Sequence, residues 1–409
     1  MALRTLLALP LLFAALPAVA QEPGLPDEAS VQGALDEHPS VAAARARVDA
    51  ARAEAEALRR GSQEFEISGS YTRRDVDMLG QFNEYDAQLT RPIRLPGKGR
   101  LDREIGRYGI DAAENIAEDA RHRAALLLAG HWFDWQTASA LAEVDRTAVS
   151  NYERSLAAVQ RREELGDASQ LDVDLARAAL ARARIAAETS EGEARLARGR
   201  LSAHFPGLAV PATAPAIPAP EIADQELARL RDQVELNSHE IAAAEAEARR
   251  SESVSDRVRR DRVADPSVGV RVFSEFGGQE RGAGLVFSMP LGGRYRRSLA
   301  ERSEAEALAA QSDLSLVRFT VRETADADLA NARFRLSAWQ RSREALEAQM
   351  DALQKLRRGY ELGEVDLDDL LLGERMTHDA FRENVRARAD AARAVTQLRI
   401  DSHALWLAD

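Results

Sequence analysis

Two acidic segments of the chain repeat one pattern, and carboxylates arranged in this way can attract cations. The segments are ELGDASQLDV, which contains Gly166 and Asp172, and ELGEVDLDDL, which contains Gly363 and Asp369. In both, the Asp follows the Gly at the same spacing, where a helical pattern resumes. If several copies of the chain placed these residues around one axis, their carboxylates would form a negative ring that concentrates cations. The alternative is an ordinary helix start, where the helix dipole favours acidic residues without any ligand.

The other residue types that carry out chemistry do not form a recognisable site in the sequence. There is no cysteine, which excludes disulfides, thiolate metal sites and thiol nucleophiles. The seven histidines, among them His38, His122, His131 and His378, show no HExxH or other ligand spacing. The segment PGKGR lacks the first glycine and the final Ser or Thr of a phosphate-binding loop. We therefore expect no enzyme activity, no metal site and no cofactor.

Composition and charge limit the class of protein. The net charge of −12 argues against nucleic-acid binding, which needs a basic face. Only 5% of the residues are aromatic and 30% are charged, a composition typical of long helices with small residues at their contacts. A length of 409 residues favours two domains or an internal repeat.

The first twenty residues have the pattern of a secretory signal peptide. Arg4 precedes an apolar run, and Ala18 and Ala20 form the small-residue cleavage pattern. We expect cleavage after Ala20; the alternative is an N-terminal membrane anchor, although the run is short and contains proline. No later stretch is apolar over the length of a transmembrane helix. The mature chain is therefore expected outside the inner membrane.

Two pairs of strands are predicted, at about 65–76 and 83–93 and at about 266–275 and 283–290. Polar and apolar residues alternate along each of them. The residues on the apolar face are Phe65, Ile67, Gly69, Tyr71, Tyr85, Ala87, Leu89, Val268, Val270, Val272, Leu285, Phe287 and Met289. Such alternation is typical of a membrane strand with lipid on one side and water on the other, and equally of a half-buried strand in a soluble sheet.

Helical patterns surround these strand pairs, and the order of elements repeats. The helices are expected at 27–60, 101–164, 171–201, 221–262, 295–361 and from Gly363 to about 407. Pro92 and Pro290 end corresponding strands, and Gly166 and Gly363 break corresponding helices. We infer a duplicated helix-strand-strand-helix-helix unit, with one copy in residues 21–204 and one in 222–409, joined by a Pro/Ala linker at 205–221.

The long helices carry heptad spacing. Trp339, Leu346, Leu353 and Tyr360 recur every seven residues, which favours helices packed side by side over a single amphipathic helix on a globular core. A membrane sheet must close because open edges leave backbone groups unpaired in lipid, and four strands are too few to close around water. Three copies would supply twelve strands.

The sequence resembles the TolC-type outer-membrane efflux proteins over nearly the whole mature chain. The resemblance rests on the duplicated unit, on RPIRLPGKGR and SMPLGGRYRR at the strand-to-helix junctions, and on the two acidic segments at the helix turns. The first junction is more similar to the heavy-metal (CzcC-like) branch than to the drug branch. The resemblance implies a mainly α-helical fold with membrane β-structure: a trimeric 12-stranded outer-membrane β-barrel continued by a long periplasmic α-helical barrel.

The resemblance also implies roles for the helix turns. They would be the periplasmic tips that meet an adaptor protein (membrane fusion protein), and the tip residues are Leu165, Gly166, Asp167, Leu362, Gly363 and Glu364. A plain helix C-cap, which needs glycine but no partner, is the alternative. Asp172, Tyr360 and Asp369 match positions of the periplasmic gate and its cation ring.

The implied function is the outer-membrane channel of a tripartite efflux system in a Gram-negative bacterium. The expected partners are two further copies of the chain, the adaptor, an inner-membrane pump of the RND type and outer-membrane lipid, with no nucleic acid. The exported substrate, metal cations or small toxic compounds, cannot be read from the chain. The alternative function is a periplasmic coiled-coil adaptor or structural protein of an export system, which should show one helical hairpin instead of two.

Overall fold

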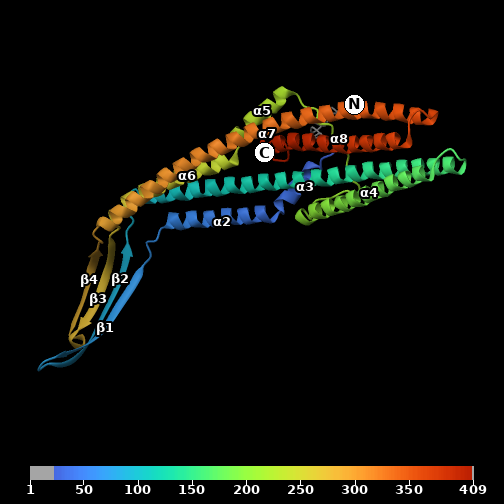
Figure 1. Cartoon of the computed structure of the whole chain (residues 1–409). Coiled ribbons are helices and arrows are strands. Elements are labelled where there is room, and N and C mark those ends of the chain that lie inside the picture. Colours follow the sequence, from blue (N-terminus) through green and yellow to red (C-terminus); the bar gives the residue numbers. More distant parts are fainter. Residues whose placement is uncertain (1–22, 408–409) are drawn as a thin grey trace, which may run out of the picture.

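The computed structural model describes residues 23–407, so the predicted signal peptide and its cleavage after Ala20 lie outside the described residues. A β-sheet forms one end of an elongated molecule, and long helices run from it to the other end (Figure 1). The elements are, in chain order, α1 (Glu28–Asp36), α2 (Pro39–Arg60), β1 (Glu66–Val76), β2 (Gly80–Pro92), α3 (Lys98–Glu164), α4 (Gln170–His204), α5 (Asp224–Leu236), α6 (His239–Arg260), β3 (Ser267–Glu275), the 3-10 helix η1 (Phe276–Gly278), β4 (Glu280–Ser288), α7 (Arg294–Leu362) and α8 (Leu367–Asp401).

The expectation of a mainly helical chain is confirmed. Helices, two strands, a long helix, a turn and a further helix occur in this order in each half. The long helices α3 and α7 have 67 and 69 residues, which at 1.5 Å per residue makes each roughly 100 Å long. In Figure 1 the α3–α4 and α7–α8 turns lie at the end of the molecule farthest from the sheet.

The four strands form one antiparallel sheet in the order β1-β2-β3-β4. The pairing of β2 with β3 joins the two halves of the chain. Since directly paired residues share a face, the register builds rows across the sheet. One row is Ile67, Leu89, Val270 and Leu285. β1 and β4 are the two edges of the sheet.

The helix predicted at 27–60 is two helices, α1 and α2. His38 separates them: its side chain accepts a hydrogen bond from the backbone N–H of Ser40, at 3.3 Å, and Pro39 occupies the first turn of α2. Proline is suited to the first helical position because the N–H that it lacks has no partner there. The prediction of one continuous helix was therefore wrong at this proline.

The helix predicted at 221–262 also divides, into α5 and α6. Ser238 caps α6 by accepting a hydrogen bond from the backbone N–H of Ile241, at 3.2 Å. Serine at a helix start satisfies one of the N–H groups that have no partner within the helix. α8 ends at Asp401, earlier than the predicted end near 407.

The hydrophobic core that contains the most bulky side chains lies in the middle of the molecule, around α3. Trp132 and Phe133 of α3 are buried there, together with Phe205 and Ile217 from the segment between α4 and α5. The Trp132 indole N–H donates to the carbonyl oxygen of Gly24 at 2.9 Å. The Pro/Ala linker therefore packs on α3.

Candidate functional site

The first functional surface is the apolar face of the sheet. Ile67, Val270 and Leu285, which share one row, are 81%, 52% and 91% exposed. The other face is polar and is crossed by ion pairs, of which Arg74–Glu84 measures 2.6 Å and Arg271–Asp86 joins β3 to β2. A sheet with one exposed apolar face and one charged face suits a boundary between lipid and water.

The two helix turns at the opposite end have the same backbone geometry. Gly166 and Gly363 have φ angles of +82° and +76°, in the left-handed region that glycine adopts without steric cost. The N–H of Asp167 donates to the carbonyl of Arg162 and the N–H of Glu364 to that of Gly359, each at 2.8 Å. Together with the bonds made by the glycine N–H groups, these contacts form a Schellman motif at each turn.

All six predicted tip residues are exposed. Leu165 and Leu362, at equivalent positions, are 61% and 57% exposed although both are apolar. A Cβ atom built on either tip glycine would meet nothing within 4 Å. The tips therefore present two matching apolar side chains on rigid turns with open space around them.

The acids beyond the tips differ from each other. The Asp172 carboxylate accepts the N–H of Ser169 at 2.8 Å, while Ser169 Oγ accepts the N–H of Asp172 at 3.2 Å. This capping box uses Asp172 to start α4. Asp369 holds the corresponding position in α8 and is exposed, and its carboxylate makes no hydrogen bond or ion pair with the residues described from 23 to 407. Of these two acids, Asp369 is therefore the one whose carboxylate takes no part in capping its helix.

The third predicted gate residue, Tyr360, links the two hairpins. Its ring lies 4.8 Å from Cζ of Arg162, which comes from the last turn of α3. A cation over an aromatic face is attracted by the ring. Around this contact, Val159 and Val173 from the first hairpin pack in one apolar cluster with Leu353 and Leu370 from the second. No hydrogen bond in the described part of the chain joins Tyr360 to Asp172 or Asp369.

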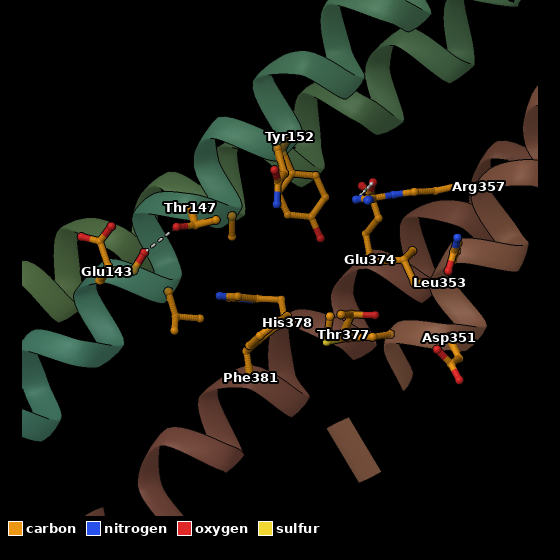
Figure 2. A pocket seen from close by; sticks show the side chains of 15 residues that line it. Glu143, Thr147, Tyr152, Asp351, Leu353, Arg357, Glu374, Thr377, His378 and Phe381 are labelled. Atoms are coloured by element: carbon orange, nitrogen blue, oxygen red, sulfur yellow. Dashed lines mark hydrogen bonds and ion pairs between the residues drawn. The ribbon is translucent and has the colours of Figure 1, made fainter. Parts of the chain in front are cut away.

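A groove between the hairpins was missed by the sequence analysis. Side chains of α3, α7 and α8 line a cavity of about 490 Å³. Figure 2 shows Tyr152 from α3 facing Arg357 of α7 and Glu374, His378 and Phe381 of α8. Burial, and then the nearby Glu374 carboxylate, raise the pKa of Tyr152 to about 12, so its hydroxyl stays protonated.

Beside this groove, a buried ionic cluster joins α3 to α8. Asp145 is completely buried and forms ion pairs with Arg382 and with Nε2 of His378, the latter at 2.7 Å. Burial alone would raise the pKa of Asp145, but hydrogen bonds from Arg382, Ser190 and His378 outweigh it and lower that pKa below its usual value. His378 thus has a structural partner on another helix, which no sequence spacing could indicate.

Residues 23–407 contain neither a cluster of metal-binding side chains nor an apolar membrane-spanning helix. No group of three or more His, Asp or Glu side chains there has the geometry to hold a metal ion. None of the helices in this part of the chain has an apolar stretch long enough to cross a membrane.

Comparison with known proteins gives a family match over part of the chain and a fold match over most of it. Residues 30–204 match the family described as "Outer membrane efflux protein", whereas no curated protein matches the chain. Among solved structures, the chain is similar to a membrane protein from Pseudomonas aeruginosa, with 20% identity, a TM-score of 0.74, and 91% of this chain and 92% of that chain covered. It is also similar to the outer membrane protein VceC from Vibrio cholerae, with 16% identity, a TM-score of 0.68, and 91% and 95% covered.

A third similar structure is the open state of the MtrE outer membrane channel from Neisseria gonorrhoeae. The identity is 17%, the TM-score is 0.69, and 93% of this chain and 89% of that chain are covered. At these identities the three structures support the fold, which extends over both halves of the chain.

Proposed function

We propose that this chain, which resembles the TolC-type outer-membrane efflux proteins, is the outer-membrane channel of a tripartite export system. The resemblance itself is confirmed by the family match over residues 30–204. Three copies close a 12-stranded barrel in the outer membrane of a Gram-negative bacterium, and their helices continue it as a tube into the periplasm. The tube passively conducts metal cations or small toxic compounds, with the heavy-metal (CzcC-like) branch as the proposed subfamily.

One observation carries this proposal: the exposed apolar row of the sheet ends at two unpaired edges, β1 and β4. In lipid an unpaired edge leaves backbone N–H and C=O groups without partners, at a cost of several kcal/mol for each group. Pairing β4 of one copy with β1 of the next removes both edges. Four strands alone would enclose no water-filled lumen, whereas twelve would.

The tips are the proposed contact with a periplasmic adaptor, itself bound to an inner-membrane pump of the RND type. Support comes from the matching Schellman turns and from the exposed Leu165 and Leu362 at equivalent positions. An apolar side chain fixed on a rigid turn loses little entropy when a partner buries it. A plain helix end would not require an exposed leucine in both hairpins.

Passage through the tube is proposed to be controlled just inside the tips. The Arg162–Tyr360 contact ties one hairpin to the other and would have to break if the hairpins separate to open the entrance. Three copies of Asp369 would form the negative ring, and Asp172 has a secondary role because its carboxylate caps α4.

The proposed function is tested by conductance in a planar lipid bilayer, with two neighbouring substitutions in β2. Leu89 lies in the apolar row and Gln88 on the opposite face. An arginine on the lipid-facing side of a membrane strand costs about 2–4 kcal/mol near the midplane, while substitutions facing the lumen are tolerated. We expect stepwise ion conductance from the parent protein and from Gln88→Arg, and strongly reduced insertion of Leu89→Arg.

Two outcomes would contradict the proposal. A parent protein that forms no conducting pores would not be a channel. Equal behaviour of the Leu89 and Gln88 variants would mean that the apolar face does not meet lipid, as expected for a periplasmic adaptor or structural protein.

A further inference from the structure

Two buried carboxyl groups lie beside an apolar seam between α7 and α8. Asp328 of α7 and Asp401 at the end of α8 are 9% and 6% exposed. The seam around them is built from small and aliphatic side chains: Val321, Ala325 and Ala332 of α7, and Ala394, Val395 and Leu398 of α8. In Figure 1 the C-terminal end of α8 lies in the middle of the molecule, where α7 and α3 also pass. An ionised carboxylate is costly in such surroundings unless it is paired.

Only one oxygen of each carboxyl group has a hydrogen-bond partner. Oδ1 of Asp328 accepts from the side-chain amide of Gln397 at 2.9 Å, and Oδ1 of Asp401 lies 2.8 Å from Nε2 of His122. Oδ2 of both groups is buried and has no partner among the described residues. Gln397, which bonds to Asp328, lies one helical turn before Asp401 on the same face of α8, so the two carboxyl groups are neighbours. Two ionised carboxylates could only accept from each other. One proton held between them would give each group the bond that it lacks.

Among the ion pairs of the described residues, His122 is the one group that can bring a positive charge to the pair, and it does so only when it is protonated. On α3, Arg123 is already paired with Asp119 at 2.8 Å and with Glu240 of α6 at 3.1 Å. His122 of α3 bonds to Asp401, and the rings of His239 from α6 and of His403, which follows α8, lie near it. The ion pairs of the described residues bring no arginine or lysine to either carboxyl group. From α5, Arg231 pairs with Asp326 on the exposed side of α7.

We propose that Asp328 and Asp401 share one proton and form a pH-sensitive clamp that holds α8 against α7. With the proton in place, the two carboxyl groups bond to each other and the seam is closed. When the proton leaves, two adjacent buried carboxylates repel and the seam opens more often. This clamp depends on the helix packing alone, and it stands whether or not the chain is a channel.

The pH range follows from the titration of Asp328. Burial, followed by the charge of Asp401 and the hydrogen bond to it, raises the pKa of Asp328 from 3.8 to about 7. The closed seam then binds the proton more tightly than the opened seam does. The shared proton therefore stabilises the closed seam most at low pH, and this stabilisation is lost as the pH rises through about 7. Between pH 5.5 and 8.5 the opening equilibrium of the seam should rise about thirty-fold.

Hydrogen exchange of the full-length protein in detergent tests the clamp. Peptides covering α7 around Asp328 and the end of α8 are followed at pH 5.5 and 8.5, after correction for the chemical exchange rate. The parent protein should show the rise in opening. Asp328→Asn should remove it, because the amide is neutral at both pH values and still donates to Asp401. Asp313→Asn, which removes an exposed charge from the same helix, should keep the rise.

Each contrary result would overturn the clamp. If exchange in these peptides of the parent protein does not increase from pH 5.5 to 8.5, the carboxyl pair releases no proton in this range. This result can be obtained without any variant. A rise that persists in Asp328→Asn assigns the titration to another group. If Asp328 merely accepts the hydrogen bond from Gln397, Asn accepts it equally well through its side-chain oxygen, and the parent protein and Asp328→Asn would show the same exchange at each pH.

Discussion

At the scale of single residues, sequence spacing predicts which charged residues occupy equivalent positions but not which partners they bind. Asp172 and Asp369 occupy the same position in their repeats, so the sequence predicts the same role for both. The structure separates them, because Ser169 makes a capping box with Asp172 whereas Asp366, at the corresponding position, makes no side-chain cap. Buried Asp145 and its partner His378 lie on helices from different repeats, so their pairing could not be predicted without the fold.

The free carboxylate of Asp369 should influence which ions pass. Replacing Asp369 with Asn keeps its size and removes three charges from the proposed ring. Single-channel recordings should then show weaker cation preference and weaker block by trivalent cations from the periplasmic side. The difference should shrink at high salt, since the Debye length is only about 3 Å at 1 M.

Asp368→Asn is the matched control, because this neighbouring acid is also exposed in the first turn of α8. It should change selectivity less than Asp369→Asn. If Asp369→Asn combined with Asp172→Asn leaves selectivity and block unchanged, the two acids are only solvated helix starts.

At the scale of elements, local patterns predicted the type of structure better than its ends. Alternation along residues 65–76 and 83–93 indicated strands, and the structure has β1 at Glu66–Val76 and β2 at Gly80–Pro92. The helix breaks before Pro39 and Ser238 were missed, because helical patterns continue on both sides of each break and a cap of one residue decides the boundary. The groove between α3, α7 and α8 depends on packing between repeats and has no signal in either repeat alone.

The tip glycines are predicted to act through local geometry. Gly166→Pro or Gly363→Pro removes the N–H that closes the turn and forbids the positive φ angle. Export and crosslinking to the adaptor, measured with a photoreactive residue at Leu165 or Leu362, should be lost. Membrane insertion and assembly should persist, because they depend on the sheet at the other end of the molecule.

Alanine substitutions distinguish a glycine that is needed for its positive φ angle from a glycine inside a regular helix. Gly166→Ala should destabilise the turn by about 1–2 kcal/mol, the cost of a left-handed residue with a Cβ atom. Gly192 lies inside α4 with open space around it, and Gly192→Ala should stabilise the helix by about 0.5–1 kcal/mol. Normal export and crosslinking in both proline variants would refute adaptor docking at the tips.

At the scale of the whole molecule, a single chain would leave the two edges of its sheet unpaired in a membrane. The apolar row crosses all four strands and stops at the open edges of β1 and β4. The helices extend from this sheet to two matching turns at the far end (Figure 1). The sequence indicated the need for closure from strand number alone. The number of copies could not follow from the chain, because nothing within one copy fixes it.

Native mass spectrometry of the detergent-solubilised protein tests the central claim, closure of the sheet by three copies, most directly. The measurement counts the chains in the particle and does not depend on the exported substrate or on the adaptor. We predict one dominant species with the mass of three mature chains, which persists when the protein is diluted. A stable single chain, or a dominant species with another number of copies, would contradict the proposed channel.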